Sequence, residues 1–343
     1  MNNFFLNSLE IIKKYQDISG AYVASPNFSQ YGFCWFRDSS FIARAMYRAG
    51  ESISANKFFD WAVKVIRSNR QGIEKVLQKD HSELTHEDLL PTRYKVDGSA
   101  NNDDWPNGQS DGYGTFLWAA HECGYDIPTD VSEIVENYIE KIWDIPCYDA
   151  WEEGPEYLHT STLFSLAAGL KAQSIVSSRK NSYERILQKI QEQHTKNGRF
   201  VKSTGNGCVD SSLLWCSYPY ALYNSENELV LKTVYEIERK LKKGYGLKRY
   251  LKDTYFGAGS WTLLSANLGS YYAITGKKEK AMEIKRWLDT KFDSNGFLAE
   301  QIAENLLAPD MYEPWVKKWG SIASPLLWAH AEYINLCLDI QNN

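Results

Sequence analysis

The 343-residue sequence has no excess of positive charge, because 38 Lys and Arg residues stand against 43 Asp and Glu and give a formal net charge of −5. It contains no basic block, and clustered Lys and Arg are what phosphate-rich partners require. We therefore expect no nucleic-acid partner and no membrane partner. No apolar run approaches about 18 residues, and the first residues lack the pattern of a signal peptide. These absences predict a cytoplasmic protein.

Several kinds of catalytic or metal chemistry are also missing. The six cysteines form no C-x-x-C pair, and the six histidines show no H-E-x-x-H spacing. Asp97, Ser99 and Asn101 are spaced like the first oxygens of a calcium loop. However, Asn102 stands where that loop needs glycine, and Gly108 stands where it needs glutamate. With no G-x-S-x-G elbow and no dinucleotide loop after a strand, the sequence predicts neither a metal nor an organic cofactor.

Aromatic residues, by contrast, are abundant: 12 Trp, 22 Tyr and 14 Phe make up 14% of the chain. Pyranose rings stack their apolar faces on Trp and Tyr, while their hydroxyl groups need polar partners. An aromatic excess without positive charge therefore favours a carbohydrate cleft. An aromatic-rich core remains the alternative at this point.

Apolar residues recur with helical spacing along the whole chain, most clearly from Val131 to Trp143. No alternating strand pattern exceeds a few residues. The segments with helical periodicity, about twelve, are 4–15, 38–49, 52–69, 111–123, 131–143, 159–172, 183–190, 210–222, 230–241, 259–275, 278–292 and 323–340.

The chain has no linker rich in Pro, Gly or Ser and no low-complexity stretch, so we expect a single domain over residues 1–343. The segments between helices are alternately short and long. This organisation predicts an all-α fold, an (α/α)6 barrel of six helical hairpins with the long loops on one face. An open helical solenoid should show a sequence repeat, and none is found.

The first long loop contains a polar pair among aromatic residues. Arg37 and Asp38 follow Tyr31 and Trp35, and the pair could hold several sugar hydroxyls, with Arg as donor and Asp as acceptor. A structural role, with Asp38 capping the following helix, is the alternative.

Two further loops carry candidate site residues. Trp105 and Gln109 suggest a stacking ring and an amide beside a cleft. Glu152 and Glu153 follow Trp151, and a carboxylate against an apolar ring has a raised pKa, as a general acid at neutral pH requires. Acidic residues are also common before helices, where they interact with the helix dipole.

A second carboxylate stands in the loop around Glu300. Hydrolysis of a glycoside needs one protonated and one ionised carboxyl group on opposite sides of the bond, and Glu300 is the candidate partner for the acidic pair. The segment from Ala303 to Lys318, with Trp315 and the nearby Trp319, is expected to close one side of the cleft.

In this order the loops resemble the catalytic domain of glycoside hydrolase family 15, the glucoamylase family, over about Tyr31 to Tyr333. Its fold is an (α/α)6 barrel, in agreement with the helical pattern. The resemblance rests on Tyr-x5-Arg-Asp at Tyr31–Asp38, Trp-x3-Gln at Trp105–Gln109, Asp-x-Trp-Glu-Glu at Asp149–Glu153, Arg-Tyr-x-x-Asp at Arg249–Asp253, Ala-Glu-Gln at Ala299–Gln301, and Trp328.

The resemblance implies an inverting, exo-acting α-glucosidase that releases β-glucose, with Glu152 as general acid and Glu300 as general base. The substrate would be a short gluco-oligosaccharide with α-1,6 or α-1,4 linkage, and the compact chain is more similar to isomaltose-acting members. The implied contacts are Tyr31, Arg37, Asp38 and Trp328 around the terminal glucose, Trp105 near the acid, and Glu153 and Arg249 toward the departing sugar.

Three alternatives stay open. Members of the family also hydrolyse trehalose. A noncatalytic glucan-binding or regulatory domain could share the fold, although the presence of both Glu152 and Glu300 speaks against it. A lyase or epimerase on the same barrel would use other bases, and a lyase would need positive charge to bind uronates.

Overall fold

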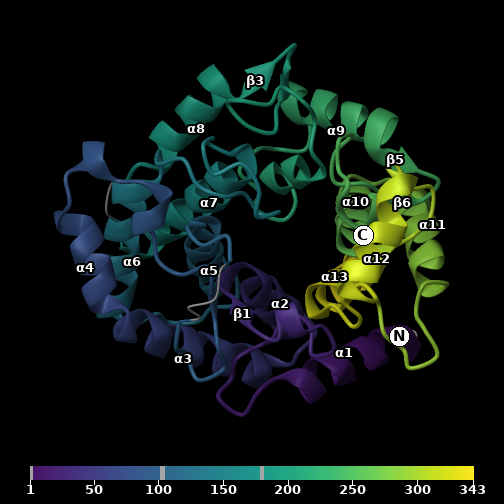
Figure 1. Cartoon of the computed structure of the whole chain (residues 1–343), viewed down its shortest axis with the longest axis horizontal. Helices are drawn as coiled ribbons and strands as arrows, with labels where there is room; N and C mark the ends of the chain where they lie inside the picture. Colours follow the sequence, from purple (N-terminus) through teal and green to yellow (C-terminus); the bar gives the residue numbers. More distant parts are fainter. Residues whose placement is uncertain (1–2, 101–104, 178–180) are drawn as a thin grey trace.

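Helices form two concentric rings in the computed structural model, which describes residues 3–100, 105–177 and 181–343 (Figure 1). The inner ring consists of α2 (Phe36–Arg48), α5 (Asp111–Glu122), α7 (Thr160–Ser177), the 3-10 segment η4 (Ser211–Cys216), α10 (Thr262–Ile274) and α13 (Leu327–Asn342). The outer ring consists of α1 (Asn3–Tyr15), α3 (Ser52–Ser68), α6 (Thr129–Ile142), α8 (Tyr183–Gln193), α9 (Glu228–Leu241) and α11 (Lys278–Asp289). Each inner element contacts the next, and α13 contacts α2, so the ring closes. The predicted (α/α)6 barrel is confirmed.

The two rings differ in how much of each helix is buried. Nearly every residue of α10 is buried, because the helix is covered on all sides. On the outer ring, α11 buries only one stripe, formed by Ala281, Ile284 and Leu288. The outer helices therefore carry the amphipathic pattern that a sequence reveals most clearly, whereas inner helices such as α7 and α10 are mainly apolar on all sides.

Glycine allows two inner helices to approach closely. A side-chain carbon on Gly114 of α5 would lie 2.4 Å from the carbonyl oxygen of Ser165 on α7. One on Gly169 of α7 would lie 2.5 Å from the carbonyl oxygen of Gly114. Any larger residue would push the helices apart, so this part of the ring depends on both glycines.

Three segments differ from the expected helices. The pattern over 210–222 predicts an α-helix, and this is wrong, because only the short 3-10 segment η4 forms there. Pro219 lacks an N–H group and disfavours helical backbone at the residue before it. Two helices that the sequence did not predict, α4 (Arg70–Gln78) and α12 (Tyr312–Trp319), lie outside the rings.

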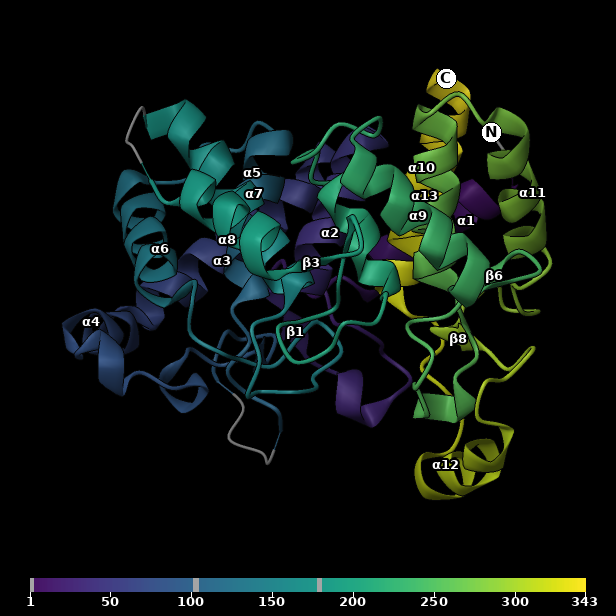
Figure 2. The same cartoon turned by 90° about the horizontal axis from the view of Figure 1, so that it is seen from above.

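Short antiparallel strands connect the loops at one end of the barrel, where α12 also projects (Figure 2). The strands are β1 (Cys34–Trp35), β2 (Arg93–Tyr94), β3 (Thr195–Lys196), β4 (Arg199–Phe200), β5 (Lys242–Lys243), β6 (Gly246–Leu247), β7 (Ser260–Trp261) and β8 (Gln301–Ile302). β1 pairs with β2 and β3 with β4, and the last four strands form one sheet in sequence order. Each long loop leads into an inner-ring element, so the loops collect around the opening of the inner ring.

Candidate active site

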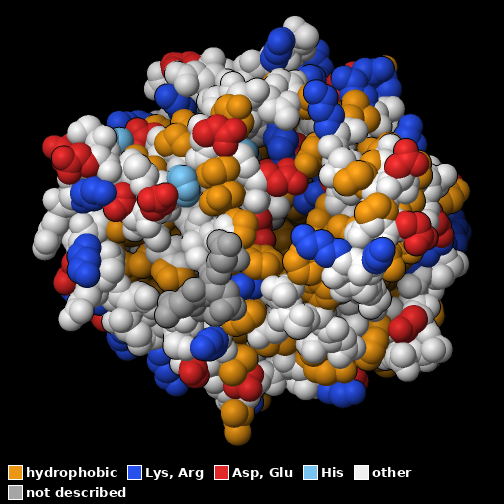
Figure 3. Space-filling model, viewed as in Figure 1, with side chains coloured by type: hydrophobic (Ala, Val, Ile, Leu, Met, Phe, Trp, Pro, Cys, Tyr) orange, Lys and Arg blue, Asp and Glu red, His pale blue; other side chains and the backbone are white. Residues whose placement is uncertain are grey.

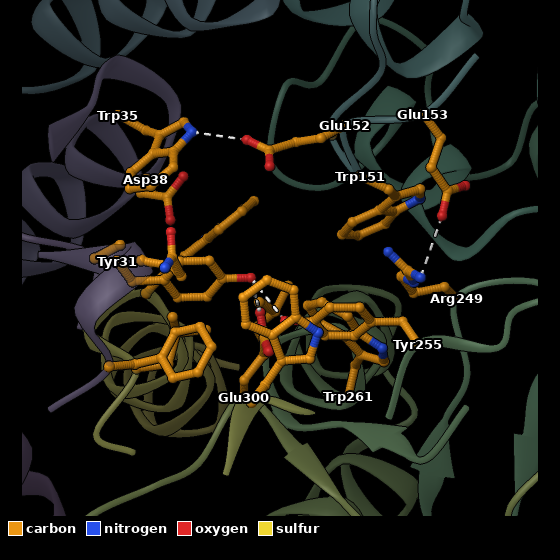
Figure 4. Close-up of a pocket in the computed structure, with 18 of the residues that line it drawn as sticks. Tyr31, Trp35, Asp38, Trp151, Glu152, Glu153, Arg249, Tyr255, Trp261 and Glu300 are labelled. Carbon is orange, nitrogen blue, oxygen red and sulfur yellow. Dashed lines mark hydrogen bonds and ion pairs between the residues drawn. The ribbon is translucent and has the colours of Figure 1, made fainter. Parts of the chain in front are cut away.

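A cavity of about 560 Å³ opens at the loop end of the inner ring, near the middle of the face seen in Figure 3. This volume lies within the range of small-molecule sites. Of the predicted site residues, all except Gln109 line the cavity: Tyr31, Trp35, Arg37, Asp38, Trp105, Trp151, Glu152, Glu153, Arg249, Glu300 and Trp328. Loops that are distant in sequence therefore meet at one pocket (Figure 4).

Glu152 occupies a strained position in the loop between α6 and α7. Its φ angle is 66°, in the left-handed region that residues other than glycine seldom adopt. Asp149 holds this turn, since its Oδ1 accepts the backbone N–H groups of Trp151 at 2.9 Å and Glu153 at 3.0 Å. The turn directs the Glu152 side chain into the pocket (Figure 4). Strain of this kind persists where surrounding structure fixes it, often at functional sites.

Three N–H donors converge on one oxygen of Glu152. Its Oε1 accepts hydrogen bonds from Nε1 of Trp35, Nε1 of Trp105 and Nε2 of Gln109, each at 3.0 Å. Within the described residues, no hydrogen bond reaches its Oε2. Because Oε1 is fully used as an acceptor, a proton on this carboxyl group belongs on Oε2. The cage therefore fixes the orientation of the carboxyl group.

Gln109 does not take the predicted place beside the pocket. It is buried behind the wall and lies outside the cavity lining. Its Nε2 donates to Glu152, and its Oε1 accepts from the Arg37 guanidinium at 2.8 Å. The amide thus connects two pocket residues instead of meeting a ligand, because the start of α5 turns it into the protein interior.

Arg37 and Asp38 form the polar end of the pocket. Arg37 Nη1 lies 2.9 Å from Oδ2 of Asp111 on α5, and its Nε lies 3.5 Å from Oδ2 of Asp38. Neither Arg37 Nε nor Asp38 Oδ2 makes a hydrogen bond within the described residues, although both are buried. Burial raises the pKa of Asp38 to about 6, against the opposing charge of Arg37. Buried polar atoms without partners are suited to receive ligand hydroxyls.

Glu300 is fixed by backbone pairing next to β8. Its N–H donates to the carbonyl oxygen of Ala323 at 2.9 Å, and its carbonyl oxygen accepts from the N–H of Thr262 at 3.1 Å. The side chain is 3% exposed and lines the pocket opposite Glu152 (Figure 4). Its Oε1 accepts from the hydroxyl group of Tyr31 at 3.3 Å, and its Oε2 has no hydrogen-bond partner within the described residues.

Burial raises the pKa of a carboxyl group on two sides of the pocket, at Glu153 and at Glu300. Burial raises the pKa of Glu300 to about 8, although Arg249 and the Tyr31 hydroxyl group act against this rise. Burial also raises the pKa of Glu153, with Arg249 and Lys202 opposing it. Burial of Glu300 therefore favours its protonated form, because a buried carboxylate loses its solvation by water.

The side of the pocket toward Glu153 carries positive charge among aromatic rings. The Arg249 guanidinium bonds Asp253 at 2.8 Å and lies 3.4 Å from Oε1 of Glu153. It also lies 5.4 Å from the Trp151 ring centre. The hydroxyl group of Tyr250 donates to Glu153 Oε2 at 2.6 Å. These contacts fix Glu153, whose side chain is 37% exposed, at the open part of the pocket.

The segment expected to close the cleft forms η6 (Pro309–Met311) and helix α12. Trp315 of α12 packs against Phe28 with ring centres 6.2 Å apart and against Tyr255 at 5.3 Å. Met311, Pro314, Trp315, Lys318 and Trp319 all line the pocket. No residue of α12 is fully buried, so the helix forms an outer wall that rests on the site.

The sequence reading missed three residues that shape the site. Tyr255 places its hydroxyl group 3.0 Å from that of Tyr31, beside Glu300. Arg93 lies 3.8 Å from the centre of the Trp105 ring, and Asp111 pairs with Arg37. No local pattern marks Tyr255 or Arg93. The only sequence signal was that Asp111 begins a helix next to Gln109.

No helix among the described residues is long and apolar enough to span a bilayer. In the same part of the chain, no group of three or more His, Cys, Asp or Glu side chains is arranged to hold a metal ion. Asn101 and Asn102, from the rejected calcium-loop comparison, lie outside the described residues.

Glycoside hydrolysis requires a proton donor and a proton acceptor on opposite sides of the scissile bond, and the pocket presents carboxyl groups in that arrangement. Fold and site together define a glycoside hydrolase. The sequence profile of the glycosyl hydrolases family 15 matches residues 2–308, and the chain belongs to that family.

Known proteins resemble this chain over most of its length. An isomaltose glucohydrolase from Kribbella flavida is 35% identical over 352 positions, which cover 97% of this chain and 91% of that protein. A glycosidase variant solved in complex with glucose has a TM-score of 0.92 at 33% identity, covering 98% of this chain and 96% of that one. A bacterial glucoamylase complexed with acarbose has a TM-score of 0.74 at 22% identity, covering 100% of this chain and 56% of that one, which is a likeness of fold.

Proposed function

We propose that this protein is an inverting, exo-acting α-glucosidase that removes the terminal glucose of short gluco-oligosaccharides, with isomaltose-type α-1,6 linkages preferred to α-1,4 linkages. The observation that carries the proposal is the pair of carboxyl groups, Glu152 and Glu300, facing each other across one pocket (Figure 4). The preference for isomaltose is supported by the relative from Kribbella flavida that is 35% identical.

In this proposal Glu152 is the general acid. Its Oε2 carries the proton, because Oε1 accepts three N–H groups. The proton passes from Oε2 to the glycosidic oxygen as the bond to the anomeric carbon breaks, and the bond electrons leave with that oxygen. Glu153 and Arg249 lie on the same side as Glu152 and would contact the departing sugar.

Glu300 is the general base. Its buried Oε2, without a partner in the described residues, would receive a proton from a water molecule that attacks the anomeric carbon from the opposite face. The base must be ionised, whereas burial raises its pKa to about 8. Bound water and sugar hydroxyls would restore part of the missing solvation and so lower this pKa.

An exo-acting enzyme needs a pocket that ends. The floor contains Trp328, whose ring stacks on Phe41 with centres 4.8 Å apart and whose Nε1 donates to Glu332 at 3.0 Å. Arg37 and Asp38 are buried at the same closed region. One terminal sugar fits this arrangement, and α12 leaves limited room beyond it, which supports a short oligosaccharide as substrate.

The anomeric form of the first product tests the mechanism. We expect β-glucose from isomaltose, measured by proton NMR before mutarotation mixes the anomers. Initial α-glucose would show direct attack by a carboxylate and would remove Glu300 from the role of base. Glucose release from isomaltose, maltose, trehalose, maltotriose and panose decides the linkage. Trehalose as the best substrate would favour the trehalose hydrolase alternative, and no release from any of them would favour a noncatalytic glucan-binding domain.

A further inference from the structure

A group of buried charges lies directly behind residues 149–153, the segment that carries Glu152, which we call the acid loop. The sequence did not reveal this group. Lys202 follows β4, and its ammonium lies 2.6 Å from Oδ2 of Asp149 and 2.9 Å from Oδ2 of Asp210. The side chains of these three residues are 8%, 2% and 0% exposed. We call them the Lys202 cluster. None of them lines the pocket, so any effect on the reaction must pass through another residue.

Both carboxylates of the cluster hold parts of the acid loop. Asp149 accepts the backbone N–H groups on either side of Glu152. Asp210 accepts the indole N–H of Trp151 at 3.0 Å, and it also accepts the backbone N–H of Ser212 at the start of η4. The lysine therefore links the backbone and the aromatic side chain of the acid loop to the inner ring.

The Lys202 ammonium also lies near Tyr250 and Glu153, on the side of the pocket where we propose that the departing sugar binds. It lies 4.4 Å from the centre of the Tyr250 ring, and the Tyr250 hydroxyl group donates to Glu153. Glu153 Oε2 itself is 4.0 Å from the ammonium. One buried cation is thus in contact with Asp149, Asp210 and Tyr250, which help to fix the positions on either side of Glu152.

The charge balance makes this cation hard to replace. Burial opposes the charge of Lys202, but Asp210 and Asp149 outweigh that effect and raise the pKa of the ammonium above its usual value. Without the ammonium, two buried carboxylates would lose the cation between them, which costs far more than the loss of a surface ion pair. Water or repulsion would then move Asp149 away from the N–H groups that hold the turn.

We propose that Lys202 is a positioning residue for departure of the leaving sugar, because it fixes the acid loop that aims Glu152 and Glu153. This inference rests on the proposed function. Lys202 takes no part in bond making: the proton moves from Glu152 to the glycosidic oxygen, and Glu300 receives a proton from water. The effect of losing Lys202 should therefore depend on the leaving group.

Two substrates separate this role from general damage to the fold. Isomaltose needs a proton on its leaving oxygen and has a leaving sugar to bind, whereas α-D-glucosyl fluoride needs little protonation and has no leaving sugar. For Lys202→Met we expect kcat on isomaltose to fall roughly 100-fold and kcat on the fluoride to fall less than about 5-fold. Asp210→Asn, which removes one of the paired charges and keeps the side-chain size, should show the same selectivity to a smaller degree.

The matched control is Lys285→Met on α11. This change removes an ammonium that lies 2.8 Å from Oδ2 of Asp289, and neither residue lines the pocket. It should leave the ratio of kcat on isomaltose to kcat on the fluoride unchanged.

Glu152→Gln is the reference variant for loss of the general acid. If Glu152→Gln spares the fluoride while Lys202→Met and Asp210→Asn lower both substrates equally, the cluster is only structural and the inference is overturned. If Glu152→Gln also lowers both equally, the acid assignment itself is wrong. Should Lys202→Met fail to fold, Asp210→Asn decides by the same ratio.

Discussion

The two sides of the pocket hold their carboxyl groups in opposite ways. Glu152 stands on a strained turn, and side chains from distant loops surround one of its oxygens with N–H donors. Glu300 stands on a paired backbone next to β8, and its buried carboxyl group meets tyrosine hydroxyl groups, with that of Tyr31 at 3.3 Å and that of Tyr255 beside it. The first group is positioned by side chains, and the second is positioned by the main chain.

This difference suits the two chemical tasks. A proton donor must direct one oxygen at the leaving group, and this requires a fixed carboxyl plane. A base that acts through water needs an open oxygen and a desolvated setting that strengthens its attraction for a proton. Mutations near Glu152 should therefore disturb the position of its carboxyl group, whereas mutations near Glu300 should change the pKa of its carboxyl group.

The largest expected effect comes from replacing the carboxyl groups themselves. Glu152→Gln and Glu300→Gln should each lower kcat on isomaltose by about 10²- to 10⁴-fold, because each removes a proton-transfer step. On α-D-glucosyl fluoride only Glu300→Gln should retain this loss. Circular dichroism should show an unchanged fold. If either variant kept more than about a tenth of the wild-type kcat on isomaltose, the role assigned to that residue would be refuted. Glu153→Gln should be milder and act mainly on KM.

A smaller effect should follow from disturbing the acid cage. Gln109→Leu removes one donor to Glu152 and one acceptor for Arg37, so kcat on isomaltose should fall roughly 10- to 100-fold through misplacement of the acid. The control is Gln16→Leu, which removes an amide that bonds Gly20 and Ser54 outside the pocket. An equal loss for the two variants would mean that Gln109 has no special role in the site.

On the base side, the expected change is in pH dependence. The Tyr31 hydroxyl group lowers the raised pKa of Glu300, so Tyr31→Phe should raise it further. The base must be ionised, and a higher pKa delays ionisation. The acidic limb of kcat/KM should therefore move to higher pH, as measured between about pH 4 and pH 9. Tyr94→Phe, which removes a buried hydroxyl group bonded to Tyr113, should not move the limb. A lower plateau with an unmoved limb would restrict Tyr31 to sugar binding.

The smallest expected effect concerns α12, because within the described residues it makes no hydrogen bond to either carboxyl group. Trp315→Ala should open the outer wall and raise the ratio of kcat/KM for isomaltotriose to that for isomaltose by roughly 5-fold, about 1 kcal/mol. Trp287→Ala on α11, distant from the cavity lining, is the matched control. An unchanged ratio would show that α12 does not limit substrate length.

Much of the fold could be read from the sequence because the outer helices carry amphipathic stripes. The exceptions have physical causes. Pro219 keeps the segment over 210–222 from continuing as a helix beyond η4, and α12 spans only eight residues, too few for helical periodicity to stand out. That residues 1–343 form a single domain and that the protein is cytoplasmic stay predictions.

The site was readable to a similar extent. Motif spacing found both carboxyl groups and eleven of the twenty-five residues that line the pocket, because these residues lie in or next to long loops that meet at one end of the barrel. The position of Gln109 could not be predicted, because a sequence does not show whether a glutamine side chain points into the pocket or into the protein interior. The Lys202 cluster was also hidden, because Asp149, Lys202 and Asp210 lie in different loops and no local pattern joins them.

The sequence by itself determined the helical periodicity, the family and the residue types that could perform acid and base catalysis, because these depend on local pattern and on motif order. Only the tertiary structure decided which oxygen of Glu152 accepts the N–H groups, that burial raises the pKa of Glu300 and which cation supports the acid loop. Protonation and orientation depend on burial and on partners from distant segments. Those neighbours exist only after the two rings have closed around the pocket.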